Sequence, residues 1–443
     1  MRFAYSFSLV LSLLVLPVVA HSQAPAEAAP PADPAAAQPA PVPEAAPLAA
    51  PALEPVPAPT PVSIEPTAPT EAAPTAPPPP EAAPPAPTAP TQLKIELPNG
   101  NSIRFGLLWQ LQYEAKGNPA NKDLSHNIFL RRFALLVGGT VLHDFEYFWD
   151  SDFADLLKSQ GEDGFKNGPG ISTKDAFVTY KGLGDEFKIE GGLLMPALSH
   201  NVLQGGASLY SWDFFFNTFR HAGAFGSTGN TYGRDLGLQL RGLVAEGLLE
   251  YRAGIFQGKR GAPVAGPPPE PGSKNFFRLT GRLQLNLLDP ETGFFYAGSY
   301  LGTKKILSFG AFVDFQPGVD DGDAYYSWGV DGFLDLPIGE DGITAQVNLV
   351  DRNGGDLIDL PQQTFVGGEL GYRIGSVDLS PIARLEHRFA PGEALDETDV
   401  GLGLAWWPYD HNANLKAFYT RVIPSEADLG YDQFNVQWQL AFY

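Results

Sequence analysis

Apolar and polar side chains alternate along most of the chain beyond residue 100. In the stretch 103–113, Ile103, Phe105 and Leu107 begin an apolar series that is interleaved with polar or small residues, and the same pattern recurs in 277–287 and 432–443. A period of two is typical of a β-strand, because successive side chains point to opposite faces. One face of each predicted strand is therefore oily, while the other carries Arg, Gln, Asn, Asp and Glu.

The alternating segments are long, at about 10–15 residues, whereas a strand of a soluble protein usually has about 5–6. A tilted strand that crosses a membrane needs about 9–11 residues. The length therefore favours an all-β, transmembrane antiparallel β-barrel with lipid outside and a wet lumen inside. The predicted strands are 103–115, 127–141, 143–153, 174–182, 186–195, 235–245, 247–257, 276–288, 303–315, 322–336, 341–351, 363–375, 377–389, 398–408, 411–422 and 432–443.

The strand count follows from parity. Single-chain bacterial barrels have an even number of strands, with short turns at one end and longer loops at the other. An apolar piece at 293–301 could be a seventeenth strand, but long and short connections alternate only if 289–302 is one connection at the short-turn end. We therefore predict 16 strands, with 18 as the alternative, and the longest surface loop at 196–234.

The first 91 residues have a different composition. Arg2 precedes the apolar run 7–20, and small residues follow it, which predicts a signal peptide over 1–24. Residues 25–91 contain 24 prolines, seven acidic residues and no basic one, so we expect a disordered Pro/Ala-rich periplasmic linker. The domain organisation is then 1–24 signal peptide, 25–91 linker and 92–443 barrel, in the outer membrane of a bacterium.

Composition and charge exclude several classes of function. The chain has no cysteine, so disulfides, thiolate nucleophiles and cysteine-based metal sites are impossible. A net charge of −21 argues against nucleic acid as a partner. The sequence also lacks G-x-S-x-G, H-E-x-x-H and Walker motifs, so we predict neither an enzyme nor a cofactor or metal site.

Charged residues on the predicted lumen faces are the candidates for ion selection, since pores select by rings of charge and by diameter. Four arginines on adjacent predicted strands form a candidate basic patch, in which guanidinium groups could bind an anion. They are Arg241, Arg252, Arg278 and Arg282. Three acids on one strand form a candidate acidic patch that could face it. The alternative is that these charges pair across the lumen and support the wall. The basic candidates are Arg132, Arg241, Arg252, Arg278 and Arg282, and the acidic ones are Asp144, Glu146 and Asp150.

Three stretches resemble the phosphate-selective porin O and P family of Gram-negative outer membranes. They are FLRRFALLVGGTVLHDFEYFWDSDFAD (129–155), DAFVTYKGLGDEFKIEGG (175–192) and GRDLGLQLRG (233–242). The resemblance spans about 100–443 and implies a 16-stranded trimeric barrel whose third surface loop folds into the pore. Here that loop is 196–234, and its arginines Arg220 and Arg234 become constriction candidates.

Family members bind anions through arginines at the constriction and a ladder of lysines, whereas the lumen faces of this chain carry both signs and no lysine run. The sequence therefore predicts a porin for small hydrophilic solutes, with phosphate or other anions as candidates. The expected partners are outer-membrane lipid, two further copies of the chain and, through residues 25–91, peptidoglycan. Two alternatives remain: a plugged barrel that anchors the membrane to the cell wall, and a barrel hydrolase.

Overall fold

The computed structural model describes residues 93–160, 165–166, 168, 170–215, 233–259, 276–319, 322–358, 361–390, 396–426 and 429–443. The predicted signal peptide and linker lie outside these residues. Within them, no helix has both the length and the apolar character needed to span a membrane. The long strands are β2 (Ser102–Gly117), β3 (Leu124–Val141), β4 (Phe145–Asp152), β7 (Ser172–Tyr180), β8 (Lys188–Leu194), β9 (Asp235–Val244), β10 (Leu249–Phe256), β11 (Arg278–Asn286), β12 (Ile306–Gln316), β13 (Tyr325–Ile338), β14 (Asp341–Asn353), β15 (Gln363–Arg373), β16 (Leu379–Phe389), β17 (Glu397–Tyr409), β18 (Ala413–Pro424) and β19 (Tyr431–Phe442).

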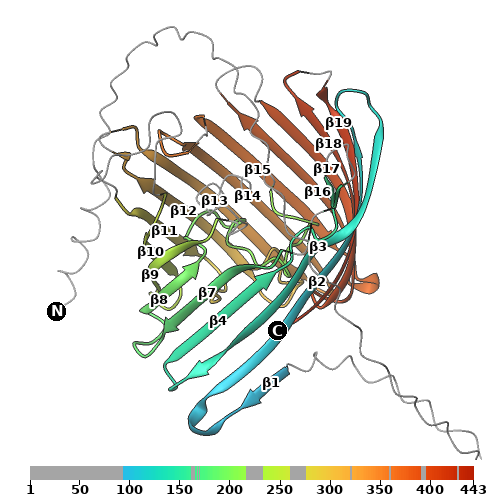
Figure 1. Cartoon of the computed structure of the whole chain (residues 1–443). Helices are drawn as coiled ribbons and strands as arrows, with labels where there is room; N and C mark the ends of the chain where they lie inside the picture. The colour runs from blue at the N-terminus through green and yellow to red at the C-terminus, as the bar shows by residue number, and fades with distance from the viewer. Residues whose placement is uncertain are drawn as a thin grey trace, which may run out of the picture. The chain divides into compact units, whose positions relative to one another are not determined.

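These 16 strands form one closed antiparallel barrel, which confirms the prediction (Figure 1). Each strand pairs with its neighbours along the chain, and β19 pairs with β2 to close the cylinder, for example at Leu440↔Trp109. Closure matters because it leaves no strand edge with unpaired backbone groups. The described residues also contain a short strand β1 (Leu93–Glu96), which pairs with β2, and a small hairpin of β5 (Ser159–Gln160) and β6 (Phe165–Lys166).

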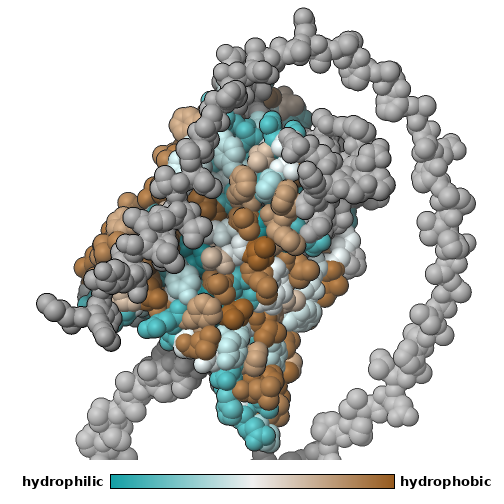
Figure 2. Space-filling view, turned by 90° about the vertical axis from the view of Figure 1, so that its left-hand side faces the viewer, coloured by the Kyte–Doolittle hydropathy of each residue, from teal (hydrophilic) through white to brown (hydrophobic). Residues whose placement is uncertain are grey.

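The alternation in the sequence becomes the two faces of the wall. On β19, Trp438 is 55% exposed on the outer face, while its neighbours Gln437 and Gln439 are fully buried inside. Trp328 and Trp406 also lie outward. Figure 2 shows one side of the barrel, where apolar residues cover much of the middle and hydrophilic residues gather towards the two ends. This is the arrangement expected of a barrel surrounded by lipid.

The two ends of the barrel differ in their connections. At one end, here called the turn end, β3–β4, β9–β10, β13–β14 and β17–β18 are joined by short turns, and β2 begins and β19 finishes there. The opposite end, here called the loop end, carries the connection between β8 and β9. One connection at the turn end is much longer than the others: it joins Asn286 of β11 to Ile306 of β12. It is the connection that the parity argument requires.

The strand register shifts at three places in the described barrel, between Trp406 and Tyr409 of β17 and at two β-bulges that bear on the lumen. Gln110 pairs with Arg132 and Leu111 with Leu130, so Arg131 is the extra residue on β3. Similarly, the register of β4 and β7 shifts at Asp150 and leaves Lys174 unmatched. A bulge redirects side chains that strict alternation would send to the other face. As a result, Arg131 and Arg132 both turn into the lumen, although a period of two sends only one of them inward.

Candidate channel and its constrictions

The described part of the loop between β8 and β9, residues 195–215, lies inside the barrel. Met195, Leu203 and Phe215 are among its almost fully buried residues, and they pack with Phe312, Val350 and Phe365 of the wall. The family resemblance implied this inward fold for 196–234. Residues 216–232 of the loop, including the constriction candidate Arg220, lie outside the described residues.

A second segment enters the lumen from the turn end. In the connection 287–305, Glu291, Tyr296 and Ser299 are buried. Its backbone bonds directly to the loop: Tyr296 N donates to Leu203 O at 2.9 Å, and Gly205 N donates to Tyr296 O at 2.9 Å. Gly298 N also donates to Ser208 O at 2.8 Å. Two segments from opposite ends of the barrel therefore meet inside it and fill much of its interior.

Side chains of the wall hold the loop by its backbone. Lys416 Nζ donates to the carbonyl oxygens of Leu209 (2.6 Å) and Ser211 (3.0 Å), and Gln439 Nε2 donates to that of Ala207 (2.7 Å). Irregular backbone that is buried must find partners for its carbonyl groups, because an unpaired one is costly. Many lumen-facing donors of the wall serve this purpose.

The segment 287–305 is held in the same manner by two of the predicted basic candidates. Arg241 Nη1 donates to the carbonyl oxygens of Thr292 and Gly293 at 3.2 and 3.3 Å. Arg252 Nη1 donates to that of Phe294 at 2.8 Å. Each arginine also pairs with a buried carboxylate, Arg241 with Glu190 at 2.9 Å and Arg252 with Glu250 at 2.7 Å.

The other two arginines of the predicted patch are also buried in ion pairs. Arg278 contacts Asp314 of β12 through two bonds of 2.7 Å. Arg282 contacts Asp331 of β13 at 2.6 and 2.8 Å and donates to Leu198 O of the loop. Bidentate pairing with a carboxylate neutralises the charge locally. These contacts are those of the alternative in which the charges support the wall and the inward segments.

The bulge on β3 brings Arg131 and Arg132 together onto Asp213 of the loop, and we call these three residues the clamp. Arg131 Nε lies 2.8 Å from Asp213 Oδ2, and Arg132 Nη2 lies 2.6 Å from Asp213 Oδ1. Burial alone would raise the pKa of Asp213, but the two guanidinium groups outweigh it and hold the pKa far below its usual range. Asp213 is therefore ionised at any physiological pH, and the clamp stays closed. Sequence reasoning missed Arg131, although two adjacent arginines in an alternating strand were a visible irregularity.

The remaining candidates are spread along the barrel. Arg234 pairs with Asp175 at 2.9 Å, and Asp150 has one buried oxygen with no hydrogen-bond partner. Glu146 pairs with Lys181 at 2.6 Å near the turn end, and Asp144 is exposed in the turn before β4. The predicted acidic patch is therefore divided: Asp150 lies deeper in the lumen than Glu146 and Asp144.

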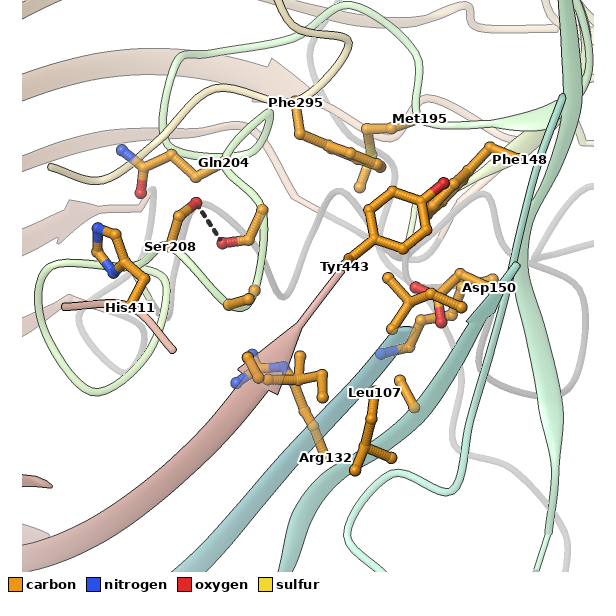
Figure 3. Close-up of a pocket in the computed structure, with 18 of the residues that line it drawn as sticks. Leu107, Arg132, Phe148, Asp150, Met195, Gln204, Ser208, Phe295, His411 and Tyr443 are labelled. Atoms are coloured by element: carbon orange, nitrogen blue, oxygen red, sulfur yellow. Dashed lines mark hydrogen bonds between the residues drawn. The ribbon is translucent and has the colours of Figure 1, made fainter. Parts of the chain in front are cut away.

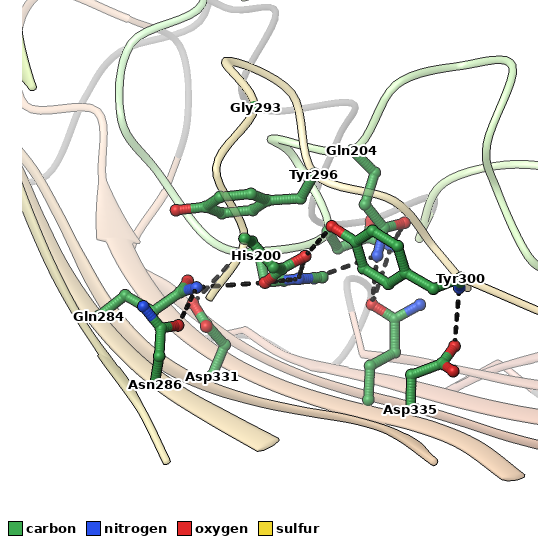
Figure 4. Close-up of polar contacts among 12 residues, drawn as sticks. His200, Gln204, Gln284, Asn286, Gly293, Tyr296, Tyr300, Asp331 and Asp335 are labelled. Carbon is green, nitrogen blue, oxygen red and sulfur yellow. Dashed lines mark hydrogen bonds and ion pairs between the residues drawn. The ribbon is translucent and has the colours of Figure 1, made fainter. Parts of the chain in front are cut away.

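A polar network links the two inward segments to the far wall (Figure 4). The ring of His200 contacts both oxygens of Glu291 at 3.1 and 3.0 Å, and Tyr300 donates to Glu291 at 2.9 Å. Gln204 and Gln284 extend the network to β14 and β11. Tyr300 is half-buried and His200, Gln204, Gln284 and Glu291 are buried, so on the β11–β14 side the inward segments are fastened to the wall.

Open space lies beside β2, on the other side of the lumen: β2 and β16–β19 line the loop-end cavity, whereas β2, β3, β4 and β7 supply most of the strand residues around the central and turn-end cavities. A loop-end cavity of about 430 Å³ includes Glu114, Lys158 and Asp399 in its lining. A central cavity of about 220 Å³ includes Arg132, Asp150 and Ser208 (Figure 3). A turn-end cavity of about 580 Å³ lies beyond it. Among the predicted candidates, Arg132, Arg234 and Asp150 line the central cavity, Arg241 and Glu146 line the turn-end cavity, and Arg252, Arg278 and Arg282 line none of these three.

The three cavities share residues at their boundaries. Arg131 and Phe214 line both the loop-end and the central cavity. Phe148, Phe295 and Tyr443 line both the central and the turn-end cavity. The cavities therefore form a series beside β2 with two junctions, a charged one at Arg131 and Phe214 and an aromatic one at Phe148, Phe295 and Tyr443.

No family model and no curated protein matches the chain. Among solved structures, the anion-selective porin from Comamonas acidovorans is similar, with a TM-score of 0.53 and 12% identity over 77% of this chain and 100% of that chain. OmpF of Salmonella typhi, in a complex with daunomycin, has a TM-score of 0.51 and 12% identity over 79% and 100%. The outer membrane channel DcaP of Acinetobacter baumannii has a TM-score of 0.50 and 12% identity over 79% and 99%.

At these identities the likeness concerns the fold alone, and membership of the phosphate-selective O and P family stays a prediction. The closed barrel of 16 strands, oily outside and polar inside, has the fold of Gram-negative outer-membrane porins.

Proposed function

We propose that this protein is an outer-membrane porin through which small hydrophilic solutes diffuse passively. The observation that carries the proposal is the series of three cavities beside β2 in a closed barrel. Porins of this fold place long loops outside the cell and short turns in the periplasm. By the same rule, the loop end of this barrel faces the medium and the turn end faces the periplasm.

The charges that line the central cavity support a weak preference for anions, phosphate among them. Arg131, Arg132, Lys174 and Arg234 line this cavity, against a single acid, Asp150. Arg132, Lys174 and Arg234 each pair with a carboxylate, however, so the net field is small. The similar Comamonas structure is named as an anion-selective porin, which agrees with this sign.

The proposal extends to the parts of the chain that the fold does not test. Residues 1–24 would direct export, and residues 25–91 would form a periplasmic arm that reaches peptidoglycan. Three copies would associate through their lipid-facing walls. Cross-linking of the purified protein in detergent would detect the trimer, and binding to isolated cell wall with and without residues 25–91 would test the arm.

Conductance in planar lipid bilayers tests the central proposal. We expect stepwise openings and, in a salt gradient, a small reversal potential of the sign for anions. If Arg220 contributes to the constriction, Arg220→Glu should shift the reversal potential towards cation selectivity. An unchanged reversal potential would exclude Arg220 as a constriction residue. Complete silence of the purified barrel would contradict the porin and favour a structural anchor.

A further inference from the structure

Three aromatic rings stand between the central and the turn-end cavity (Figure 3). Phe148 comes from β4, Phe295 from the segment 287–305, and Tyr443 follows β19. The ring centroids of Phe148 and Tyr443 are 5.5 Å apart, and those of Phe148 and Phe295 are 6.2 Å apart. Both pairs meet edge to face, a favourable geometry for aromatic contacts. We call these three residues the aromatic collar.

The collar is held from several sides. Tyr443 lies against Gly106 and Gly138, where any added Cβ would overlap its ring or hydroxyl. The guanidinium of Arg104 lies 4.1 Å from the centroid of the Tyr443 ring. Phe295 is placed by its neighbours, because Arg252 holds the carbonyl of Phe294 and His411 donates to that of Ser299 at 2.8 Å.

The chemistry of the collar differs from that of the charged junction. Aromatic rings cannot replace the water shell of a small hydrated ion, so such an ion loses hydration free energy as it passes. A solute with an aromatic or apolar face loses less water and gains ring contacts. The central cavity is large enough to hold such a solute, since a cavity of about 150 Å³ can already bind benzene.

Apolar side chains make up much of the lining next to the collar. Leu108, Leu136, Met195 and Val202 belong to the central cavity, with the basic groups of Arg131 and Arg132 towards its loop end. The Arg234 guanidinium also lies 5.9 Å from the centroid of the Phe295 ring. A small organic anion with a ring and one carboxylate would therefore find both apolar surface and guanidinium groups in this cavity.

We propose that the aromatic collar of Phe148, Phe295 and Tyr443 is a second constriction, which favours small organic solutes with an aromatic face over strongly hydrated ions. The inference rests on the proposed porin function and adds the class of solute to it. On this proposal the turn-end segment 287–305 takes part directly in solute selection, because it contributes Phe295.

The test compares Phe295→Ala with Phe294→Ala in planar bilayers. Phe294 is an equally large ring in the same segment. It packs on Phe177 at 4.5 Å and on Phe295 at 4.7 Å between ring centroids, but of the central and turn-end cavities it lines only the turn-end one. We expect Phe295→Ala to raise the conductance in potassium chloride roughly twofold or more, because it removes one side of the hydrophobic constriction. Phe294→Ala should change it much less.

Bi-ionic potentials give the second readout. Acetate is smaller than benzoate, so simple sieving favours acetate, whereas the collar favours benzoate. The benzoate-to-acetate permeability ratio should be higher in the natural chain than in Phe295→Ala; if cations carry the current, phenyltrimethylammonium and tetramethylammonium replace the two anions. A conducting channel whose conductance and ratio are the same in both forms, or changed equally by Phe294→Ala, would overturn the collar alone. If the natural chain, Phe295→Ala and Phe294→Ala all fail to conduct, both the porin function and the collar are overturned.

Discussion

The loop 195–215 and the segment 287–305 both enter the lumen, but the wall holds them differently. The loop is held along its length, by Lys416 and Gln439 at its backbone and by the Arg131–Arg132 clamp at Asp213. The segment is held at residues 292–294 by the arginines Arg241 and Arg252, and further along by Asp335, which accepts hydrogen bonds from Ser299 and from Tyr300 N. The loop contributes a charged junction to the channel, and the segment contributes an aromatic one. In both places, charged side chains of the wall bind the carbonyl groups of irregular backbone.

Removal of the clamp should have the largest effect. Asp213→Asn removes the carboxylate that pairs with the buried Arg132 and leaves Arg131 with Asp155 at 3.2 Å, and breaking a buried pair from one side costs about 3 kcal/mol. We expect a matching loss in the free energy of unfolding, measured by tryptophan fluorescence in detergent, together with noisier channel openings.

The matched control is Asp432→Asn, which breaks an exposed pair with Arg421. Exposed pairs contribute about 0–1 kcal/mol, so the control should unfold almost as the natural chain does. Equal behaviour of the two variants would show that Asp213 does not fasten the loop.

A comparison of two buried arginines sharpens the distinction between wall and segment. Arg252→Gln and Arg278→Gln each leave a buried carboxylate uncompensated, so both should lower the unfolding free energy by up to about 3 kcal/mol. Only Arg252 holds the segment, through Phe294 O and Gly293 O. We therefore expect Arg252→Gln to alter single-channel conductance and Arg278→Gln to leave it unchanged. A change of conductance in both variants would refute the special role of the segment.

A smaller loss of stability is expected from a substitution at Gly138, which lies against the Tyr443 hydroxyl. In Gly138→Ala the new methyl group overlaps the Tyr443 hydroxyl, and overpacking of this kind costs about 1 kcal/mol. Tyr443→Phe removes that hydroxyl, so the double variant should recover part of both the stability and the conductance. If the double variant were as impaired as Gly138→Ala, the contact with Tyr443 would not be the cause.

The smallest effect concerns pH. Burial, with the charge of Lys416 adding to it, lowers the pKa of His411 from 6.5 to about 4. Because the unfolded chain takes up a proton between about pH 6.5 and 4 that the folded chain does not, stability should fall as the pH falls through this window. His411→Gln keeps a donor for Ser299 O but cannot titrate, so its melting temperature should fall less over the same range. Identical pH profiles would exclude His411 as the source.

The sequence predicted the wall well and the interior poorly. The predicted strands 276–288 and 432–443 correspond to Arg278–Asn286 and Tyr431–Phe442, because alternation over a membrane-length strand is a local pattern. The inward segments carry no such period, and their meeting at Leu203 and Tyr296 joins residues far apart in the chain. The bulge at Arg131 also interrupts the alternation from which the sequence assigns each side chain to the lumen face or the lipid face. For these reasons the aromatic collar and the clamp could not be predicted.

The central claim is that solutes cross the barrel through the three cavities beside β2. Because the chain has no cysteine, single cysteines can be modified cleanly. Ser208 lines the central cavity, whereas Ser308 is buried on the inner face of β12 and lines none of the three cavities. In bilayers, a cationic thiosulfonate reagent should reduce the current through Ser208→Cys and leave Ser308→Cys unaffected. Block of Ser308→Cys with no effect on Ser208→Cys would contradict this pathway.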